Sequence, residues 1–306
     1  MIVPEKVPAH MRPDVLKPSA TERLAVRGLD YQVRRWGPRD APRLFLLHGW
    51  MDTSATFQFV VDALRHDWQI IAPDWRGYGG TAWLGRPYWF PDYYADLDVL
   101  LAHYAPDGPV RLVGHSMGAN IASIYAGLRP QRVAQLAMLD FIGLKLPVDG
   151  DSPTQLERWL DAQTVPPQLR AYPDHDALAR RLRTANPRLN AERADFLARQ
   201  VSRVRADGLI EIAGDPWHKI PSPLVYRIED AMAVWRRVRA PVLMLFSAQG
   251  YVQQRFGDDP DALRSRLDCF ADVRVETVAD AGHNLQHDQP ERVAAALEDF
   301  LAREPA

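Results

Sequence analysis

Short apolar runs alternate along this sequence with amphipathic stretches of helical length, and this alternation constrains the fold more than any other feature. The apolar runs lie at residues 44–47, 69–72, 110–113, 133–139, 241–246 and 273–278. The helical stretches lie at residues 54–65, 92–104, 116–128, 262–270 and 291–301. Continuous apolar runs are typical of strands that are buried on both faces. Together with a hairpin formed by residues 22–27 and 31–36, they predict an α/β fold with a mostly parallel, eight-stranded sheet and flanking helices.

The pattern changes between the sixth and the seventh predicted strand. Residues 141–238 are rich in Arg, Asp, Leu and Ala, with helical periodicity and no convincing strand. Such a segment is too long and too regular for a loop, so we expect a helical cap inserted into the α/β unit. The expected organisation is an irregular N-terminal arm at residues 1–20, an α/β core at residues 21–140 and 239–306, and a helical cap at residues 141–238.

The composition argues against several classes of binding partner. The formal charge is −2 at pH 7, which gives no electrostatic footprint for nucleic acid or for an anionic membrane. The only cysteine is Cys269, which fits a reducing compartment. Residues 1–20 lack the apolar run of a secretory signal, and no segment is long enough to span a membrane. We therefore expect a cytoplasmic protein that acts on a small molecule, with no nucleic-acid or membrane partner.

Residues 114–118 carry the strongest chemical signal. They read Gly-His-Ser-Met-Gly, between the predicted strand at 110–113 and the predicted helix at 116–128. This is the G-x-S-x-G pattern of a nucleophile elbow, in which a sharp turn leaves no room for side chains beside the serine. The helix N-terminus there offers backbone N–H groups to a developing oxyanion. Ser116 is therefore the candidate nucleophile, and the Met117 N–H is a candidate oxyanion donor.

Two further motifs supply partners for that serine. His48, Gly49 and Trp50 follow an early strand, where such a fold places its second oxyanion donor, so we assign this role to the Trp50 N–H. We expect His48 itself to be a buried scaffold residue. His283 follows Gly282 between the last strand and the last helix, where an imidazole can take the serine proton.

Taken together, these motifs resemble the α/β-hydrolase superfamily in order and spacing over residues 22–303. They are residues 48–50, 73–79 (Pro-Asp-Trp-Arg-Gly-Tyr-Gly), 114–118 and 282–283, followed by Asp288 and Pro290. Within the superfamily, residues 48–52 and 249–251 look most like the serine hydrolase-like proteins. The resemblance implies an α/β-hydrolase fold with a helical cap and a serine hydrolase activity. No Cys/His cluster has metal-ligand spacing and no Gly-rich phosphate loop occurs, so we expect neither a metal nor a cofactor.

The acid of the expected Ser-His-Asp triad is missing from its usual place. In most relatives an Asp follows the strand after the cap, whereas this sequence has Gly250 there. Asp140 ends the preceding strand, and certain haloalkane dehalogenases place their acid at this strand end, so the resemblance implies that Asp140 could orient His283. Asp140 could instead bond backbone N–H groups at the start of the cap. Asp258, Asp280 or a missing acid are the remaining alternatives.

Ser116, His283 and Asp140 predict acyl transfer on a small uncharged ester or related acyl substrate, with a carboxylester as the default. A serine at position 116 argues against dehalogenase or epoxide hydrolase chemistry, where the elbow residue is a carboxylate. Two alternatives stay open: a non-catalytic small-ligand-binding protein, suggested by Gly250, and a C–C hydrolase or lyase that uses the same Ser and His. The aromatic residues at 83–91 and in the cap suit either an acyl pocket or packing of the cap on the core.

Overall fold

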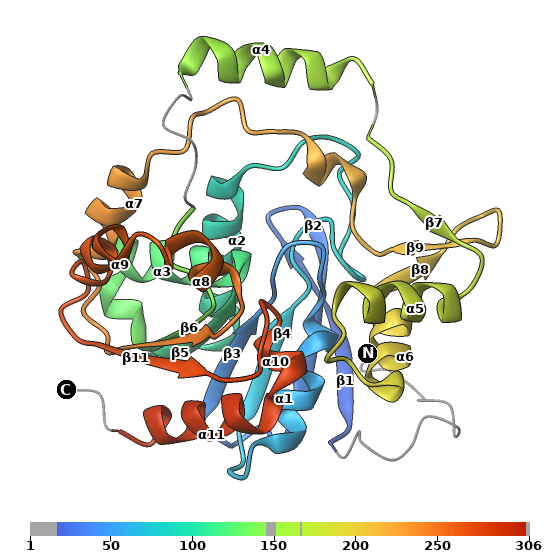
Figure 1. The fold of residues 1–306 in the computed structure, drawn as a ribbon. Helices are drawn as coiled ribbons and strands as arrows, with labels where there is room; N and C mark the ends of the chain where they lie inside the picture. Colours follow the sequence, from blue (N-terminus) through green and yellow to red (C-terminus); the bar gives the residue numbers. More distant parts are fainter. Residues whose placement is uncertain (1–16, 145–150, 166, 304–306) are drawn as a thin grey trace.

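A computed structural model describes residues 17–144, 151–165 and 167–303 (Figure 1). Its centre is an eight-stranded sheet with the strand order β1-β2-β4-β3-β5-β6-β10-β11. The strands are β1 (Ser19–Val26), β2 (Leu29–Trp36), β3 (Arg43–Leu47), β4 (Gln69–Pro73), β5 (Val110–His115), β6 (Val133–Leu139), β10 (Val242–Ser247) and β11 (Val273–Val278). β2 is antiparallel to β1 and to β4, and the other neighbouring pairs are parallel. The predicted α/β-hydrolase sheet is therefore confirmed.

Helices cover both faces of this sheet. In the core they are α1 (Gln58–Ala63) with the short 3-10 helix η1 (Ser54–Phe57), α2 (Phe90–Tyr104), α3 (Met117–Leu128), the 3-10 helix η2 (Pro130–Arg132), α8 (Tyr251–Phe256), α9 (Pro260–Leu267), α10 (Leu285–Asp288) and α11 (Pro290–Leu301). In the part of the chain that the structure describes, no helix is long and apolar enough to cross a bilayer.

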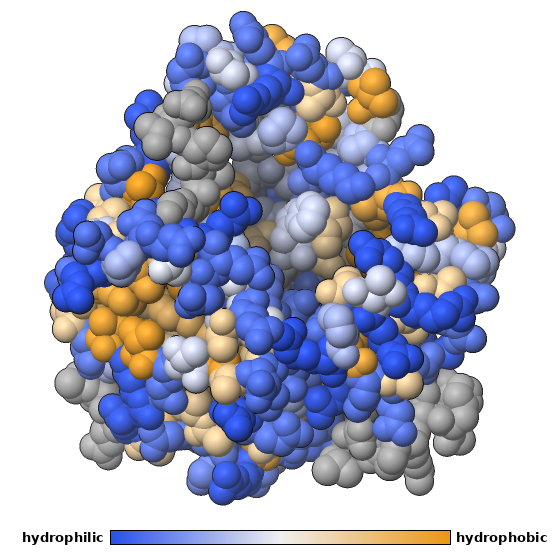
Figure 2. All heavy atoms as spheres, viewed as in Figure 1, coloured by the Kyte–Doolittle hydropathy of each residue, from blue (hydrophilic) through white to orange (hydrophobic). Residues whose placement is uncertain are grey.

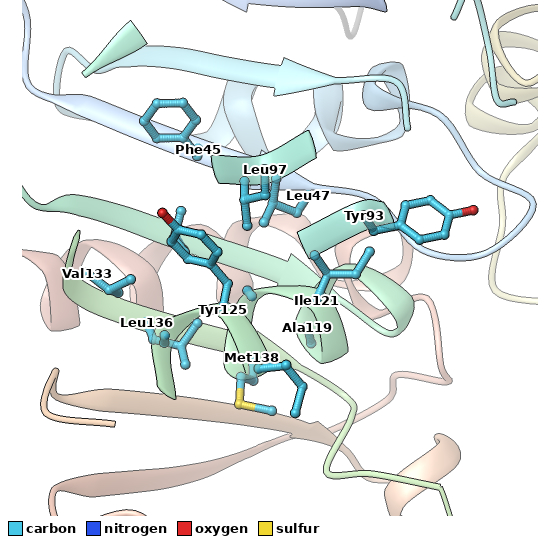
Figure 3. Close-up of a cluster of buried hydrophobic side chains, with 14 of the residues drawn as sticks. Phe45, Leu47, Tyr93, Leu97, Ala119, Ile121, Tyr125, Val133, Leu136 and Met138 are labelled. Atoms are coloured by element: carbon cyan, nitrogen blue, oxygen red, sulfur yellow. The ribbon is translucent and has the colours of Figure 1, made fainter. Parts of the chain in front are cut away.

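Successive residues of the central strands enter opposite hydrophobic clusters. Phe45 and Leu47 of β3 pack with α2 and α3 on one face (Figure 3). Leu44 and Leu46 of the same strand pack with α1 and α11 on the other face. Because side chains alternate across a strand, a strand that is buried on both faces needs an unbroken apolar run. This is the physical origin of the runs seen in the sequence.

The N-terminal hairpin is longer than predicted. β1 begins at Ser19, inside the segment expected to be an irregular arm, and pairs with β2 through a two-residue turn at Arg27 and Gly28. Both turn residues have positive φ, at 47° and 82°, as a type I′ turn requires. Residues 1–16 of the expected arm lie outside the described residues.

The segment between β6 and β10 contains strands as well as helices. Its helices are α4 (Ser152–Gln163), α5 (His175–Ala185), α6 (Ala191–Gln200), the 3-10 helix η3 (Pro216–Lys219) and α7 (Ile228–Trp235). A three-stranded antiparallel sheet of β7 (Ala171–Tyr172), β8 (Ser202–Val204) and β9 (Ile210–Ile212) lies among them. The expectation of a segment without strands was wrong, because strands of two or three residues are too short to show an alternating pattern. Asp207-Gly208, in the turn between β8 and β9, is the hairpin signal in the sequence.

This inserted segment is fastened to the core through the loop after β4. Gly79 N–H donates to Ala213 O at 2.7 Å, and Asp215 N–H donates to Gly77 O at 2.7 Å. The imidazole of His218 stacks between the rings of Tyr78 and Tyr88, with centroids 3.9 and 3.7 Å away. Tyr88 is one of the aromatic residues at 83–91, and its ring packs the inserted segment against the core. Figure 2 shows the same face of the molecule as Figure 1, hollowed below α4.

Candidate active site

Ser116 stands in a strained turn between β5 and α3. Its φ is 50° and its ψ is −112°, a conformation that non-glycine residues seldom adopt. The two motif glycines make this turn possible: a Cβ on Gly118 would lie 2.0 Å from Leu47 O, and one on Gly114 would lie 2.5 Å from Gly118 O. The turn leaves the serine partly exposed at the carboxyl edge of the sheet.

His283 and Asp140 meet Ser116 at this edge. His283 Nε2 lies 3.0 Å from Ser116 Oγ, and His283 Nδ1 lies 2.8 Å from Asp140 Oδ2. With Nδ1–H donating to the carboxylate, Nε2 is free to accept from the serine hydroxyl. Asp140 is fully buried, whereas the His283 side chain is 39% exposed. The three residues follow β5, β6 and β11, and carboxyl ends of parallel strands gather at one edge of a sheet.

The Asp140 carboxylate packs directly against Gly250. Asp140, at a φ of 48°, accepts hydrogen bonds from Ser247 N–H at 3.1 Å and from Tyr251 N–H at 2.6 Å. A Cβ on Gly250 would lie 2.2 Å from Asp140 Oδ2. The glycine at the usual acid position therefore leaves the space that the Asp140 carboxylate fills. The alternative acids, Asp258 and Asp280, are exposed.

His48 orients the peptide that carries the Trp50 N–H. His48 is fully buried, as predicted, and its Nε2 accepts from Trp75 N–H at 2.9 Å. Nδ1 therefore carries the proton and donates to Gly49 O at 2.8 Å. Burial lowers the pKa of His48 to about 4, which keeps this neutral form in place at neutral pH. Since the C=O and N–H of a trans peptide point in opposite directions, the Trp50 N–H points away from His48.

The loop at residues 48–50 lies beside the nucleophile. A Cβ on Gly49 would lie only 3.4 Å from Ser116 Cβ. Met117 is the first residue of α3, so its N–H has no acceptor within the helix. Trp50 is 53% exposed. Trp50 thus belongs to a loop that lies beside Ser116, and Met117 belongs to the helix N-terminus that follows Ser116.

Asp52, in the same loop, has a shifted pKa that its place in the sequence motif at residues 48–52 did not indicate. Burial raises the pKa of Asp52 to about 7, and the Asp74 carboxylate acts in the same direction. Hydrogen bonds from Thr53 N–H at 2.9 Å and Thr56 Oγ1 at 3.0 Å oppose this shift. A raised acid pKa means that the folded state holds the proton more tightly than the unfolded state, so stability falls as pH rises from about 4 to about 7.

We expect Asp52→Asn to remove this loss. Relative to wild type, the variant should gain about 2 kcal/mol of unfolding free energy between pH 4 and pH 7 and nothing further above pH 8. This gain is about half of the free energy that corresponds to the full pKa shift, because Asp52 is partly exposed and solvent screens its charge. Urea unfolding at several pH values measures the difference, with Asp258→Asn as the exposed control. Parallel stability curves for wild type and Asp52→Asn would contradict the expectation.

Comparisons with known proteins place this site in a family. The profile of the alpha/beta hydrolase fold matches residues 42–290. The chain is 28% identical over 306 residues to a serine hydrolase-like protein of Danio rerio, covering 95% of this chain and 91% of the relative. A hypothetical protein from Pseudomonas aeruginosa PAO1 has a similar structure, with a TM-score of 0.80, 26% identity and coverage of 92% and 99% of the two chains.

The thioesterase domain from the curacin biosynthetic pathway has a similar fold, with a TM-score of 0.79, 24% identity and coverage of 90% and 98% of the two chains. Matches of this extent cover the sheet, the elbow and the inserted segment together. The protein belongs to the alpha/beta hydrolase fold family, and within that family it is most like the serine hydrolase-like proteins.

Proposed function

We propose that this protein is a serine hydrolase that cleaves a small uncharged ester or related acyl substrate through an acyl-enzyme. The observation that carries the proposal is the chain of hydrogen bonds from Ser116 Oγ to His283 Nε2, at 3.0 Å, and from His283 Nδ1 to Asp140, at 2.8 Å. A serine hydroxyl becomes an effective nucleophile when an oriented imidazole accepts its proton. Membership of the α/β hydrolase family supports the same class of reaction.

The proposed reaction has two halves. Ser116 Oγ attacks the acyl carbon while His283 Nε2 takes the hydroxyl proton, and the Asp140 carboxylate stabilises the imidazolium that forms. The N–H groups of Trp50 and Met117 hold the oxyanion of the tetrahedral intermediate. His283 then gives its proton to the leaving oxygen. In the second half, water adds to the acyl-enzyme with the same proton transfers and releases the acid and free Ser116.

The surroundings of His283 support an apolar acyl group. The ring of Tyr251 lies 6.0 Å from the imidazole of His283, and it stacks on Phe141 at 6.0 Å. Aromatic walls suit an uncharged substrate, for which burial beside the nucleophile carries no charge penalty. We further propose that residues 141–238 act as a cap over the site and determine which acyl groups fit.

The ligand-binding alternative has less support. It was suggested by the absence of an acid at position 250, and the Asp140 carboxylate fills the space beside Gly250. A C–C hydrolase or lyase would use the same Ser116 and His283. Trapping the acyl-enzyme separates hydrolysis from binding, because a binding protein has no need of an activated serine.

Labelling with a fluorophosphonate probe, read by intact mass, tests the proposal. We expect wild type to gain one phosphonyl group and Ser116→Ala to gain none, because the probe reacts with an activated serine. Ser123→Ala is the matched control: Ser123 lies on the same helix, buried and bonded to Asn120 O, and its variant should label at the wild-type rate. A folded wild type without adduct, or a labelled Ser116→Ala, would overturn the proposal.

A further inference from the structure

His115 precedes the nucleophile in the elbow, but its side chain contacts the histidine loop rather than the space above Ser116. His115 is buried, and its Nε2 lies 2.8 Å from the main-chain oxygen of His283. A carbonyl oxygen can only accept, so Nε2 carries the proton. His115 Nδ1 is then an acceptor, and the Nε2 amide of Gln286 lies 3.2 Å from it. Both contacts specify one neutral tautomer of His115.

We propose that His115 is a positioning residue, which holds the main-chain carbonyl of His283 and so sets the imidazole between Ser116 and Asp140. The inference rests on the proposed function, because the position of His283 matters for the rate only if this residue takes the proton of Ser116. This role for the second residue of the elbow follows neither from the G-x-S-x-G pattern nor from the hydrogen bonds of Ser116.

Two other backbone hydrogen bonds hold the loop that carries His283. Gly282 N–H donates to Asp288 Oδ2 at 2.8 Å, and Gln249 N–H donates to Ala281 O at 3.1 Å. Both hydrogen bonds hold residues of the loop that precede His283, and neither joins the loop to β5. The hydrogen bond from His115 is therefore the anchor that ties the backbone of His283 to the strand that presents Ser116.

The surroundings of His115 favour its neutral form. Burial, together with the neighbouring His283, holds the pKa of His115 well below its usual value, so the ring stays neutral and Nδ1 stays an acceptor. Without the His115 N–H, the carbonyl of His283 would lose its donor and the loop could shift. A displacement of about 1 Å at a reacting group costs roughly 100-fold in rate.

Three variants of His115 test the inference with p-nitrophenyl acetate and with the rate of fluorophosphonate labelling. In His115→Leu, which has no donor, we expect kcat and the labelling rate to fall roughly 10- to 100-fold, while KM changes less than about twofold. His115→Gln should recover most of the rate, because its amide places an N–H near the position of the imidazole Nε2–H. His115→Asn, whose amide is too short to reach, should behave like His115→Leu and serves if the leucine variant does not fold.

His287→Leu is the matched control. His287 is also a buried histidine near His283, and its ring packs against Phe59 at a centroid distance of 6.2 Å. The control should lower stability without changing kcat. Wild-type kcat in His115→Leu or His115→Asn, an effect on KM alone, or equal losses in the glutamine and asparagine variants would overturn the inference. A wild type that neither labels nor turns over ester would instead overturn the proposed function.

Discussion

Replacing Asp140 with Asn is expected to lower ester turnover by about 10⁴-fold while the protein stays folded. The carboxylate accepts from His283 Nδ1–H at 2.8 Å, and an amide in its place stabilises the imidazolium less and permits the wrong tautomer of His283. Asn tolerates the positive φ of 48° at this position, so the backbone turn should survive. The loss should therefore appear in kcat and in the labelling rate rather than in the folded fraction.

The experiment compares Asp140→Asn with the two other candidate acids. Asp280→Asn and Asp258→Asn change exposed carboxylates between Ser116 and His283 in chain order, so both should turn over substrate at the wild-type rate. Circular dichroism and thermal unfolding check that each variant is folded. Normal turnover in Asp140→Asn, or a comparable loss in either control, would rule out Asp140 as the partner of His283.

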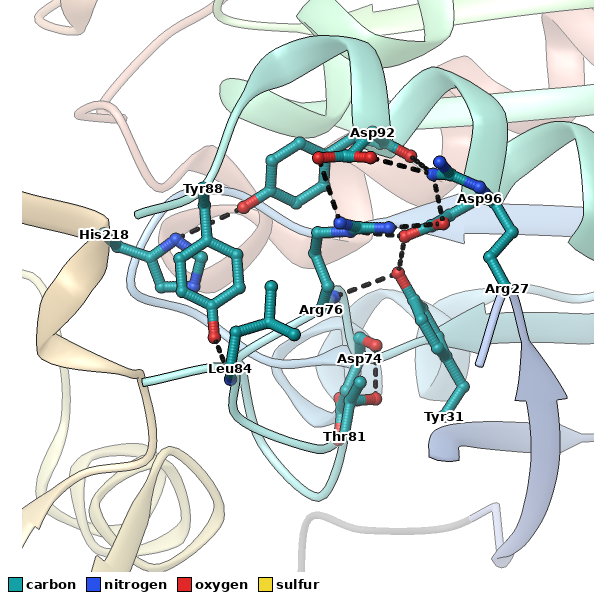
Figure 4. A network of polar contacts seen from close by, with 11 residues as sticks. Arg27, Tyr31, Asp74, Arg76, Thr81, Leu84, Tyr88, Asp92, Asp96 and His218 are labelled. Atoms are coloured by element: carbon teal, nitrogen blue, oxygen red, sulfur yellow. Dashed lines mark hydrogen bonds and ion pairs between the residues drawn. The ribbon is translucent and has the colours of Figure 1, made fainter. Parts of the chain in front are cut away.

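Replacing Asp96 with Asn is expected to cost about 3–5 kcal/mol of unfolding free energy. Asp96 is fully buried on α2, where it accepts from Arg76 Nε at 2.6 Å and Arg76 Nη2 at 2.7 Å (Figure 4). Arg27 Nη1, at 3.1 Å, and the hydroxyl of Tyr31 donate to the same carboxylate. An amide would leave the buried Arg76 guanidinium with too little negative charge, and a buried ion without its partner is strongly destabilising.

Chemical unfolding at constant pH measures this cost, with Asp98→Asn as the control on the same helix. The Asp98 side chain is 49% exposed, its ion pair with Arg129 spans 3.9 Å, and an amide oxygen can still accept from the Tyr125 hydroxyl 2.7 Å away, so the control should lose less than about 1 kcal/mol. Since Arg76 belongs to the loop on which residues 213–218 dock, Asp96→Asn should also loosen the inserted segment. If the unfolding free energy of Asp96→Asn lies within about 1 kcal/mol of the wild-type value, Asp92, 3.2 Å from Arg76, is sufficient to balance the charge of the guanidinium.

The sequence alone was sufficient for the features that depend on neighbouring residues. Apolar runs such as residues 44–47 predicted strands buried on both faces, because alternation along a strand is a local property. The glycines around Ser116 predicted the elbow: the clash that Gly114 avoids arises within the turn itself, although the clash that Gly118 avoids is with Leu47 of the neighbouring strand β3. The eight-stranded α/β-hydrolase sheet was predictable on the same grounds.

Only the tertiary structure decided what depends on residues far apart in the chain. Three carboxylates stood open as partners of His283, and in the folded chain Asp140 lies 2.8 Å from the imidazole, with Gly250 leaving it room. The hydrogen bond from His115 to the carbonyl of His283 spans 168 positions, and the raised pKa of Asp52 comes from burial and from Asp74. Hydrogen bonds, steric room and desolvation are set by which groups the packed chain brings within a few ångströms, and local patterns do not encode those distances.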